Sequence, residues 1–170
     1  MPRRFLFSGH ADARFGDTDT TLMFTDTNGR HSTPDPQEVV NTLAQFTPPL
    51  ELSVLNGCNS YALGCKLLRR NMQWVVCWRT KVADGAARKF AVAFFKELMR
   101  SDDVRGAFNE AKTAVKAVKR SGFDDLGAPV QVQKYVLRDP DLPTLQKSFT
   151  PAPINAGIPE LLSLAGEDDE

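Results

Sequence analysis

The sequence predicts an α/β domain with a mostly parallel sheet and helices on both of its faces. Short apolar runs with the length of strands alternate with longer segments in which apolar residues recur every three or four positions. That order is typical of βαβ units, whose connections are right-handed. One run, residues 74–78, is apolar at every position, as expected for a central parallel strand that is buried on both faces.

The N-terminal part of the chain is predicted to contain two strands and then a helix. Residues 4–8 are expected to form a buried strand, and residues 21–25 a second short strand that ends at an Asp-Thr-Asn-Gly turn. A helix is expected to start at Asp35, because Pro36 suits the first helical position. Apolar residues then follow at helical spacing until a pair of prolines ends the pattern.

The middle of the chain continues the alternation of strands and helices. Residues 51–56 are predicted to form a strand and residues 60–71 a helix, followed by the central strand at residues 74–78. Asp84 is a good N-cap for the next helix, in which apolar residues form a wide face.

One more helix and one more strand are predicted in the C-terminal part of the folded domain. The helix is expected to begin after Ser101 or Asp102, either of which suits the N-cap position, and to stop at Gly122. Apolar and polar side chains alternate over residues 130–137, which predicts a final strand at an edge of the sheet.

The predicted folded domain spans residues 1–138, and residues 139–170 are predicted to form a mostly irregular tail. Five of the chain's 11 prolines lie in this tail, which ends in the acidic sequence Gly-Glu-Asp-Asp-Glu. Such a composition buries too little apolar surface to fold by itself. The length of 170 residues supports one domain with a sizeable core.

Charge and cysteine content exclude several classes of function. The 21 basic and 21 acidic residues give a formal net charge of zero, so the charge favours neither nucleic acid nor an anionic membrane as a partner. No apolar run has the length of a signal peptide or a membrane span. The three cysteines form no CxxC pair, and a zinc site built from them and His10 would have atypical ligand spacing, so no metal is expected. A reducing, cytoplasmic location is expected.

His10 and Cys58 each follow a predicted strand after a short turn-forming sequence. If the strands at 4–8 and 51–56 are parallel neighbours, both side chains lie at the carboxyl edge of the sheet, where open α/β sheets bind ligands. A thiol and an imidazole at that edge are the parts of a cysteine nucleophile with its general base. A free thiol has a pKa of roughly 8.5, and an imidazolium or a helix N-terminus stabilises its thiolate. Taken singly, each residue is also compatible with a structural role.

Several segments resemble the motifs of the caspase-like peptidases of clan CD. Residues 7–11 (Phe-Ser-Gly-His-Ala) resemble the family's strand ending in Ser/Gly-His-Gly, and residues 54–60 (Val-Leu-Asn-Gly-Cys-Asn-Ser) resemble its Leu-Asn-x-Cys-x-Ser nucleophile turn. Residues 78–98 resemble its Trp-x-Val-x-Asp segment with the Phe-rich helix that follows, and residues 107–111 match its Ala-hydrophobic-x-x-Ala helix. The resemblance covers about residues 4–120. It is closest to the CHAT branch, which is related to separase, caspases and metacaspases.

The resemblance implies a caspase-like three-layer sandwich and a cysteine endopeptidase that acts on a protein or peptide without a cofactor. Cys58 would be the nucleophile and His10 the general base. The backbone N–H groups of Cys58 and Ala11 would form the oxyanion hole, and Ala11 stands where the family has glycine. Trp78 would lie near the substrate channel, the alternative being core packing. Asp12, in the acidic loop after His10, is a candidate substrate contact, the alternative being a solvated loop.

The strand at residues 4–8 is also a candidate binding edge. Caspase-like domains normally have a strand and a helix, or more, before the histidine strand, so the resemblance implies a sheet that lacks its N-terminal strand or strands. A partner chain or domain would then complete the sheet. The alternative function is accordingly a catalytically silent, CHAT-like protein-interaction module that binds a partner through this edge.

Overall fold

The computed structural model describes residues 3–16, 19–144 and 150–164. These residues form a mixed α/β fold with a mostly parallel central sheet, as the sequence predicted. The chain divides into two compact units. The first unit contains residues 1–80 and 159–170, and the second contains residues 81–158.

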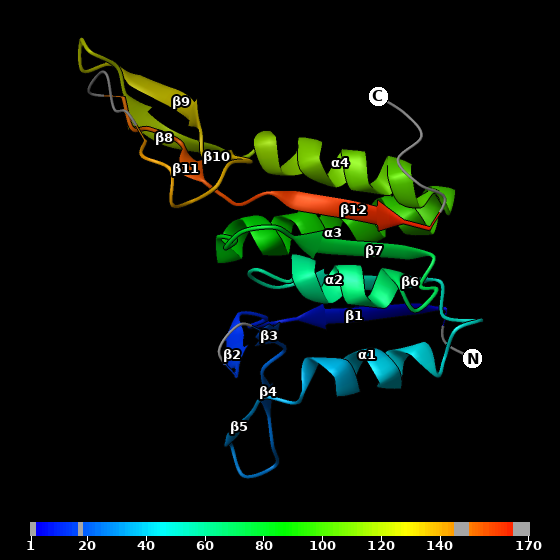
Figure 1. Ribbon diagram of the computed structural model, residues 1–170. Coiled ribbons are helices and arrows are strands. Elements are labelled where there is room, and N and C mark those ends of the chain that lie inside the picture. The colour runs from blue at the N-terminus through cyan, green and yellow to red at the C-terminus, as the bar shows by residue number, and fades with distance from the viewer. Residues whose placement is uncertain (1–2, 17–18, 145–149, 165–170) are drawn as a thin grey trace. The chain divides into compact units, whose positions relative to one another are not determined.

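The sheet of the first unit has the strand order β1-β6-β7-β12 (Figure 1). Its strands are β1 (Arg4–Ser8), β6 (Leu52–Asn56), β7 (Trp74–Trp78) and β12 (Pro159–Ser163). The first three run parallel to one another, and β12 runs antiparallel to β7. Within the part of the chain that the structure describes, β1 pairs only with β6 and therefore lies at an edge of the sheet.

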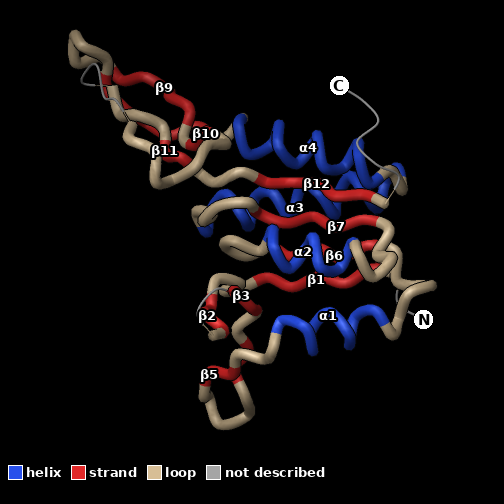
Figure 2. The backbone as a smooth tube through the Cα atoms, in the orientation of Figure 1, coloured by secondary structure: helices blue, strands red, loops and turns tan. Residues whose placement is uncertain are grey.

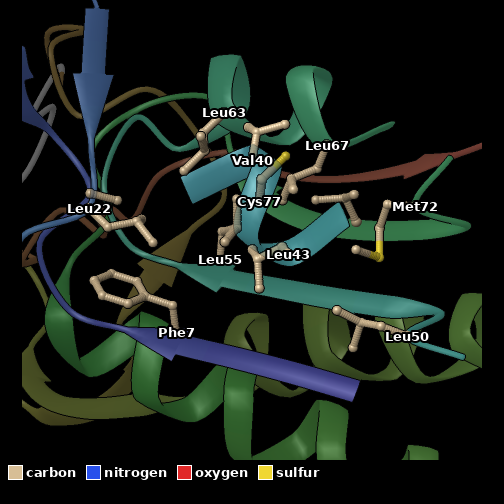
Figure 3. Close-up of a cluster of buried hydrophobic side chains, with 12 residues drawn as sticks. Phe7, Leu22, Val40, Leu43, Leu50, Leu55, Leu63, Leu67, Met72 and Cys77 are labelled. Carbon is tan, nitrogen blue, oxygen red and sulfur yellow. The ribbon is translucent and has the colours of Figure 1, made fainter. Parts of the chain in front are cut away.

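Two helices, α1 (Pro36–Ala44) and α2 (Tyr61–Leu68), pack on one face of this sheet. Their apolar side chains join Phe7, Leu55 and Cys77 from three strands in one buried cluster (Figure 3). Burying a large apolar side chain contributes roughly 1.5–3 kcal/mol relative to leaving it exposed, so this cluster is a main source of the unit's stability. Residues on the other face of the central strands, such as Val54 and Val76, are buried as well, which confirms the predicted burial of both faces.

The start of α1 is as the sequence predicted. Asp35 is the N-cap, and its Oδ1 accepts a hydrogen bond of 2.7 Å from the Gln37 N–H. Pro36 is the first helical residue, where its missing N–H leaves no helical hydrogen bond unmade. The cap therefore satisfies one of the N–H groups that have no partner within the helix.

Asp35→Ala is expected to lower the free energy of unfolding by about 1 kcal/mol, because the Gln37 N–H would lose its acceptor. Urea denaturation measures this change. Asp35→Ser keeps an acceptor at the same position and should retain most of the stability. An Asp35→Ala protein as stable as the wild type would contradict this role of the cap.

Between β1 and α1 the chain forms two small two-stranded sheets in place of the single strand predicted at residues 21–25 (Figure 2). The pairs are β2 (Ala13–Phe15) with β3 (Asp19–Thr21), and β4 (Phe24–Thr25) with β5 (His31–Ser32). The predicted strand is interrupted because Leu22 joins the buried cluster and the Met23 N–H donates to the His10 carbonyl at 2.8 Å. Contacts of Leu22 and Met23 with distant residues thus interrupt a segment whose composition is typical of a strand.

The second unit is built on two helices, α3 (Asp84–Ser101) and α4 (Val104–Lys116), that pack against each other. Between the two helices, the Phe90 and Phe108 rings pack edge to face, with 5.6 Å between the ring centres. Its strands are β8 (Lys119–Phe123), β9 (Pro129–Gln133), β10 (Tyr135–Val136) and β11 (Ile154–Asn155). β8 and β9 form an antiparallel pair, and β10 runs parallel to β11. The single strand predicted over residues 130–137 at an edge of the main sheet was wrong: β9 and β10 lie there, and they belong to two separate two-stranded sheets.

The predicted N-caps of both helices in this unit were wrong. Asp84 is the first residue of α3, and the N-cap is Ala83. α4 has Asp103 as its N-cap instead of Ser101 or Asp102. In α4 the reason is that Asp102 adopts a left-handed conformation (φ 54°), which ends α3 and leaves Asp103 as the N-cap of the helix that begins at Val104.

The predicted end of the second helix was also wrong. α4 ends at Lys116, and Gly122 lies inside β8. A Cβ atom on Gly122 would lie 2.8 Å from the Pro151 Cδ, so this glycine allows a close approach of another segment to the strand. A glycine that the sequence suggested as a helix stop therefore has a packing role.

β12 is a strand that the sequence analysis missed, because it lies in the segment predicted to be a mostly irregular tail. Pro159 begins the strand, a position at which proline is tolerated. Leu161 lies opposite Val76, so β12 pairs with the outer side of β7 and covers a backbone edge that would otherwise be open. Residues 145–149 and 165–170 of the predicted tail lie outside the described residues.

Candidate active site

The structure places His10 and Cys58 after two neighbouring parallel strands. β1 and β6 pair with Ser8 opposite Asn56. His10 lies two residues past Ser8, and Cys58 lies two residues past Asn56. His10 and Cys58 therefore follow paired residues by the same number of positions, and both lie just beyond the same carboxyl edge of the sheet. Neighbouring strands are about 4.8 Å apart, so this register brings the two turns together.

The two turns touch at Gly57, the residue before Cys58. A Cβ atom on Gly57 would lie 2.3 Å from the Gly9 carbonyl oxygen, 2.8 Å from the Ala11 Cβ and 3.2 Å from the Ala11 nitrogen. Only glycine fits this space without displacing the backbone of the opposite turn. The backbone on both sides of His10 thus lies against the backbone that precedes Cys58.

Both candidate side chains are accessible to solvent, because His10 is exposed and Cys58 is only partly buried. Cys58 lies in the turn that leads into α2, close to a helix N-terminus, and helix N-termini favour negative charge. Asn59 adopts a left-handed conformation (φ 52°), and its N–H donates to the Thr80 carbonyl at 3.1 Å. This bond ties the turn of Cys58 to the segment that follows β7.

A buried hydrogen-bond network, which the sequence analysis missed, joins the carboxyl ends of the three parallel strands. Ser60 Oγ donates to the Leu55 carbonyl at 2.9 Å and accepts from the Trp78 backbone N–H at 3.0 Å. Trp78 Nε1 donates to Asn56 Oδ1 at 3.0 Å, and Asn56 Nδ2 donates to Ser8 Oγ at 3.4 Å. The sequence signal for this network is slight: a polar residue at the end of an otherwise apolar strand, and a serine shortly after it.

Trp78 lies in the interior and has no exposed surface (0 %). The resemblance implied a position near the substrate channel, whereas the structure has the core packing that was the alternative. Its ring N–H donates a hydrogen bond to Asn56, so the indole holds the end of β6, which precedes the turn of Cys58. We assign Trp78 no contact with a substrate in this structure.

Ala11 and Asp12 lie in the turn that follows β1. Ala11 is buried, and it is not among the described residues with a positive φ, so alanine in place of the glycine that the resemblance implies introduces no left-handed strain. Asp12 is partly exposed in the stretch between His10 and β2. Its carboxylate can therefore face solvent or an approaching substrate.

A second group of side chains at the same edge was not singled out from the sequence. Arg79 directly follows β7, and its Nε donates to Glu160 Oε1 at 2.7 Å. The guanidinium carbon also lies 4.3 Å from the centre of the Tyr61 ring, at the start of α2. The bond and charge of Glu160 raise the pKa of the Arg79 guanidinium above its ordinary value. A cation is thus held close to the turn that carries Cys58.

None of the three cysteines forms a disulfide with a described residue. Cys77 is buried, and this burial raises the pKa of its thiol well above the ordinary value, with the nearby Cys65 adding to the effect. Cys77 therefore suits the core position expected from the sequence. Over residues 3–16, 19–144 and 150–164, no group of three or more His, Cys, Asp or Glu side chains could hold a metal ion.

No protein-family model matches this chain, and no curated protein matches it. Among the described helices, none combines the length and the apolar character needed to cross a membrane.

Proposed function

We propose that this chain is a caspase-like, CHAT-type cysteine endopeptidase domain with Cys58 as nucleophile and His10 as general base. The observation that supports this most strongly is the register of β1 and β6, because it carries an accessible imidazole and a partly accessible thiol to the same edge of the sheet. The contact of Gly57 with Gly9 and Ala11 supports it further, since it keeps the two turns in one arrangement.

In the proposed reaction the imidazole of His10 takes the proton of the Cys58 thiol. The thiolate sulfur attacks the carbonyl carbon of the scissile peptide bond and forms a tetrahedral intermediate. When that intermediate collapses, His10 gives the proton to the leaving amine, and an acyl-enzyme remains. A water molecule, deprotonated by His10, then attacks the thioester and releases the acid and the free thiol. The reaction balances without a cofactor or metal.

The oxyanion of the tetrahedral intermediate would accept hydrogen bonds from the backbone N–H groups of Cys58 and Ala11. The Ala11 nitrogen would lie 3.2 Å from a Cβ atom on Gly57, the residue directly before the nucleophile, so it lies next to the turn that carries Cys58. Such a donor contributes on the order of 3 kcal/mol to stabilisation of the transition state. Because these donors belong to the backbone, the network of Ser60, Asn56 and Trp78 would act as a positioning device.

The proposed substrate is a protein or peptide in extended form. Asp12 lies after the general base and is the proposed substrate contact. We place the activity in the cytoplasm, where reducing conditions keep the nucleophilic thiol available.

The alkylation rate of Cys58 by iodoacetamide, read site by site by mass spectrometry as a function of pH, tests this proposal. A thiolate stabilised by the imidazole should react at about pH 6, and His10→Ala should slow that reaction about tenfold or more. Cys77 is an internal control in every sample, because its buried thiol stays protonated and should remain unlabelled. A His31→Ala variant controls for loss of an exposed histidine elsewhere.

Labelling of Cys58 that rises only near about pH 8.5, equally in wild type and His10→Ala, would contradict a thiolate of Cys58 that is stabilised by the imidazole of His10. That outcome would favour the second function class, a catalytically silent CHAT-like protein-interaction module. Circular dichroism of each variant at the same pH values separates a lost ion pair from a lost fold.

A further inference from the structure

The open edge of β1 presents backbone groups that point away from the sheet. The Arg3 carbonyl accepts from the Leu52 N–H at 3.2 Å, and the Gly9 N–H donates to the Asn56 carbonyl at 3.4 Å. These bonds place the backbone groups of the odd-numbered residues toward β6, because the direction alternates along a strand. The N–H and C=O of Leu6 therefore face outward, and among the described residues β1 has no second strand to pair with them.

Leu6 is the central residue of this five-residue strand, and its side chain is 47 % exposed. An edge strand that carries an apolar, half-exposed residue at its centre is a template for another strand. Native proteins usually protect such an edge by charge, proline, a bulge or a cover. The strand sequence Arg-Phe-Leu-Phe-Ser has a charge only at its first residue.

An apolar groove of about 530 Å³ lies beside this edge. Its apolar wall is formed by Phe5 of β1, residues of the β3–β5 region and residues of α1, namely Leu22, Phe24, Pro34, Val39 and Leu43. In Figure 1, α1 and the β4–β5 segment lie on the side of β1 that faces away from β6. A strand added to β1 would therefore pass along the groove.

The charged side chains that line this groove are negative. Among the described residues that line it, Asp26 and Glu38 carry charge, and none is a lysine or arginine. Both residues are exposed, and Asp26 Oδ1 accepts hydrogen bonds from the Asn28 and Arg30 N–H groups, so a basic side chain of a ligand would meet a carboxylate at this rim of the groove. The groove is therefore complementary to a segment that combines a large apolar side chain with a basic one.

We propose that this edge binds an extended peptide segment of a partner protein by β-augmentation. The segment pairs its backbone with the outward N–H and C=O of Leu6. It places a large apolar side chain against Phe5 and Leu43, and a lysine or arginine beside Asp26 or Glu38. The site is separate from the proposed chemistry of Cys58 and does not depend on it.

The experiment uses the full chain with Cys58→Ala, so that the probe is not hydrolysed. The probe is the acetylated and amidated heptapeptide KTVTLTK, whose two apolar side chains and two lysines lie on the same face of an extended strand. Amide hydrogen exchange, resolved by NMR, is measured with and without about 1 mM peptide, a concentration that detects even weak binding. The Leu6 amide should exchange rapidly in the free protein and about tenfold or more slowly with peptide, whereas the Phe7 amide should be protected in both states.

Two matched controls separate backbone pairing from general adhesion. A peptide with N-methyl groups on the alternate amides of one edge keeps the side chains but cannot donate along that edge, and it should lose the effect. Leu6→Pro removes the outward N–H of the protein, is compatible with an edge strand, and leaves the bonds to β6 in place. If Leu6→Pro fails to fold, the N-methylated peptide still decides the question.

The charge assignment has its own pair of variants on α1. Glu38→Gln and Gln37→Lys change the net charge by the same amount, but only Glu38 lines the groove. Glu38→Gln should weaken binding about threefold, and Gln37→Lys should weaken it less. Equal weakening by both variants would overturn the charge assignment.

Three results would overturn the site as a whole. The first is a Leu6 amide that is already protected in the free monomer, and the second is equal binding of the N-methylated and unmodified peptides. The third is a concentration-dependent dimer that Leu6→Pro dissociates, because a second copy would then occupy the edge. Loss of peptidase activity would contradict the proposed function alone, since binding is measured without the nucleophile.

Discussion

Replacing Cys58 with alanine is expected to abolish peptide hydrolysis by this chain while its fold is kept. Removal of the nucleophile leaves no group to form the acyl-enzyme, so kcat/KM should fall about 10⁴-fold or more. The free energy of unfolding should change by less than about 1 kcal/mol, because Cys58 is only partly buried and lies in a turn. Hydrolysis of a fluorescence-quenched tetrapeptide library, together with urea denaturation of the same samples, measures both quantities.

The matched control for this variant is Cys65→Ala, which removes a second partly buried thiol, seven residues further along the chain in α2. It should leave hydrolysis unchanged. Equal activity of the wild type and Cys58→Ala would exclude Cys58 as the nucleophile. A wild-type chain that cleaves no member of the library, under conditions in which Cys58 reacts with iodoacetamide, would favour the interaction module.

Gly57→Ala is expected to destabilise the protein by about 3 kcal/mol or more and to separate the two turns of the candidate site. The new Cβ would lie 2.3 Å from the Gly9 carbonyl oxygen, a backbone atom of a neighbouring strand end that cannot rotate away. The clash is relieved only by moving one turn from the other. Labelling of Cys58 at about pH 6 should therefore slow even in molecules that remain folded, if His10 stabilises the thiolate.

Gly106→Ala is the matched control for this prediction. Its Cβ would also come close to another atom, Asp103 Oδ2 at 2.4 Å, but that atom is the end of a flexible carboxylate that can turn aside. Gly106 lies inside α4, where alanine is the better helix former, so Gly106→Ala should be neutral or stabilising by up to about 1 kcal/mol. Urea denaturation of both variants provides the comparison, and a Gly57→Ala protein with wild-type stability would contradict the close contact of the turns.

The local chemistry of the sequence predicts several elements of the first unit. Asp35 followed by Pro36 predicts the start of α1, because capping and proline geometry act within one turn of the helix. The apolar run at residues 74–78 predicts β7, because a central parallel strand buries both faces. The positions of His10 and Cys58 after two such runs predict their common edge once the strands are taken as neighbours.

Other features depend on contacts between distant segments and left little signal. β12 joins the sheet through its pairing with β7, and a short segment among prolines has no pattern that predicts this partner. The burial of Trp78 and its bond to Asn56 follow from the position of three strand ends. Gly57 looks like an ordinary turn residue in the sequence, whereas the structure requires glycine there because another backbone lies against it.

Periodicity and capping within short windows of the sequence predict the mixed α/β class, the main strands and the start of α1. They also place His10 and Cys58 after strands, although the common edge of the two residues depends on which strands are neighbours. The strand order, which leaves β1 at an edge, arises from the tertiary structure, as does the contact of the two turns at Gly57. So does the apolar groove with its two carboxylates, which Phe5 of β1 lines. A free strand edge, a groove and a close backbone contact each depend on which segments are adjacent in space. A sequence pattern predicts such adjacency only for segments that are also close in the chain.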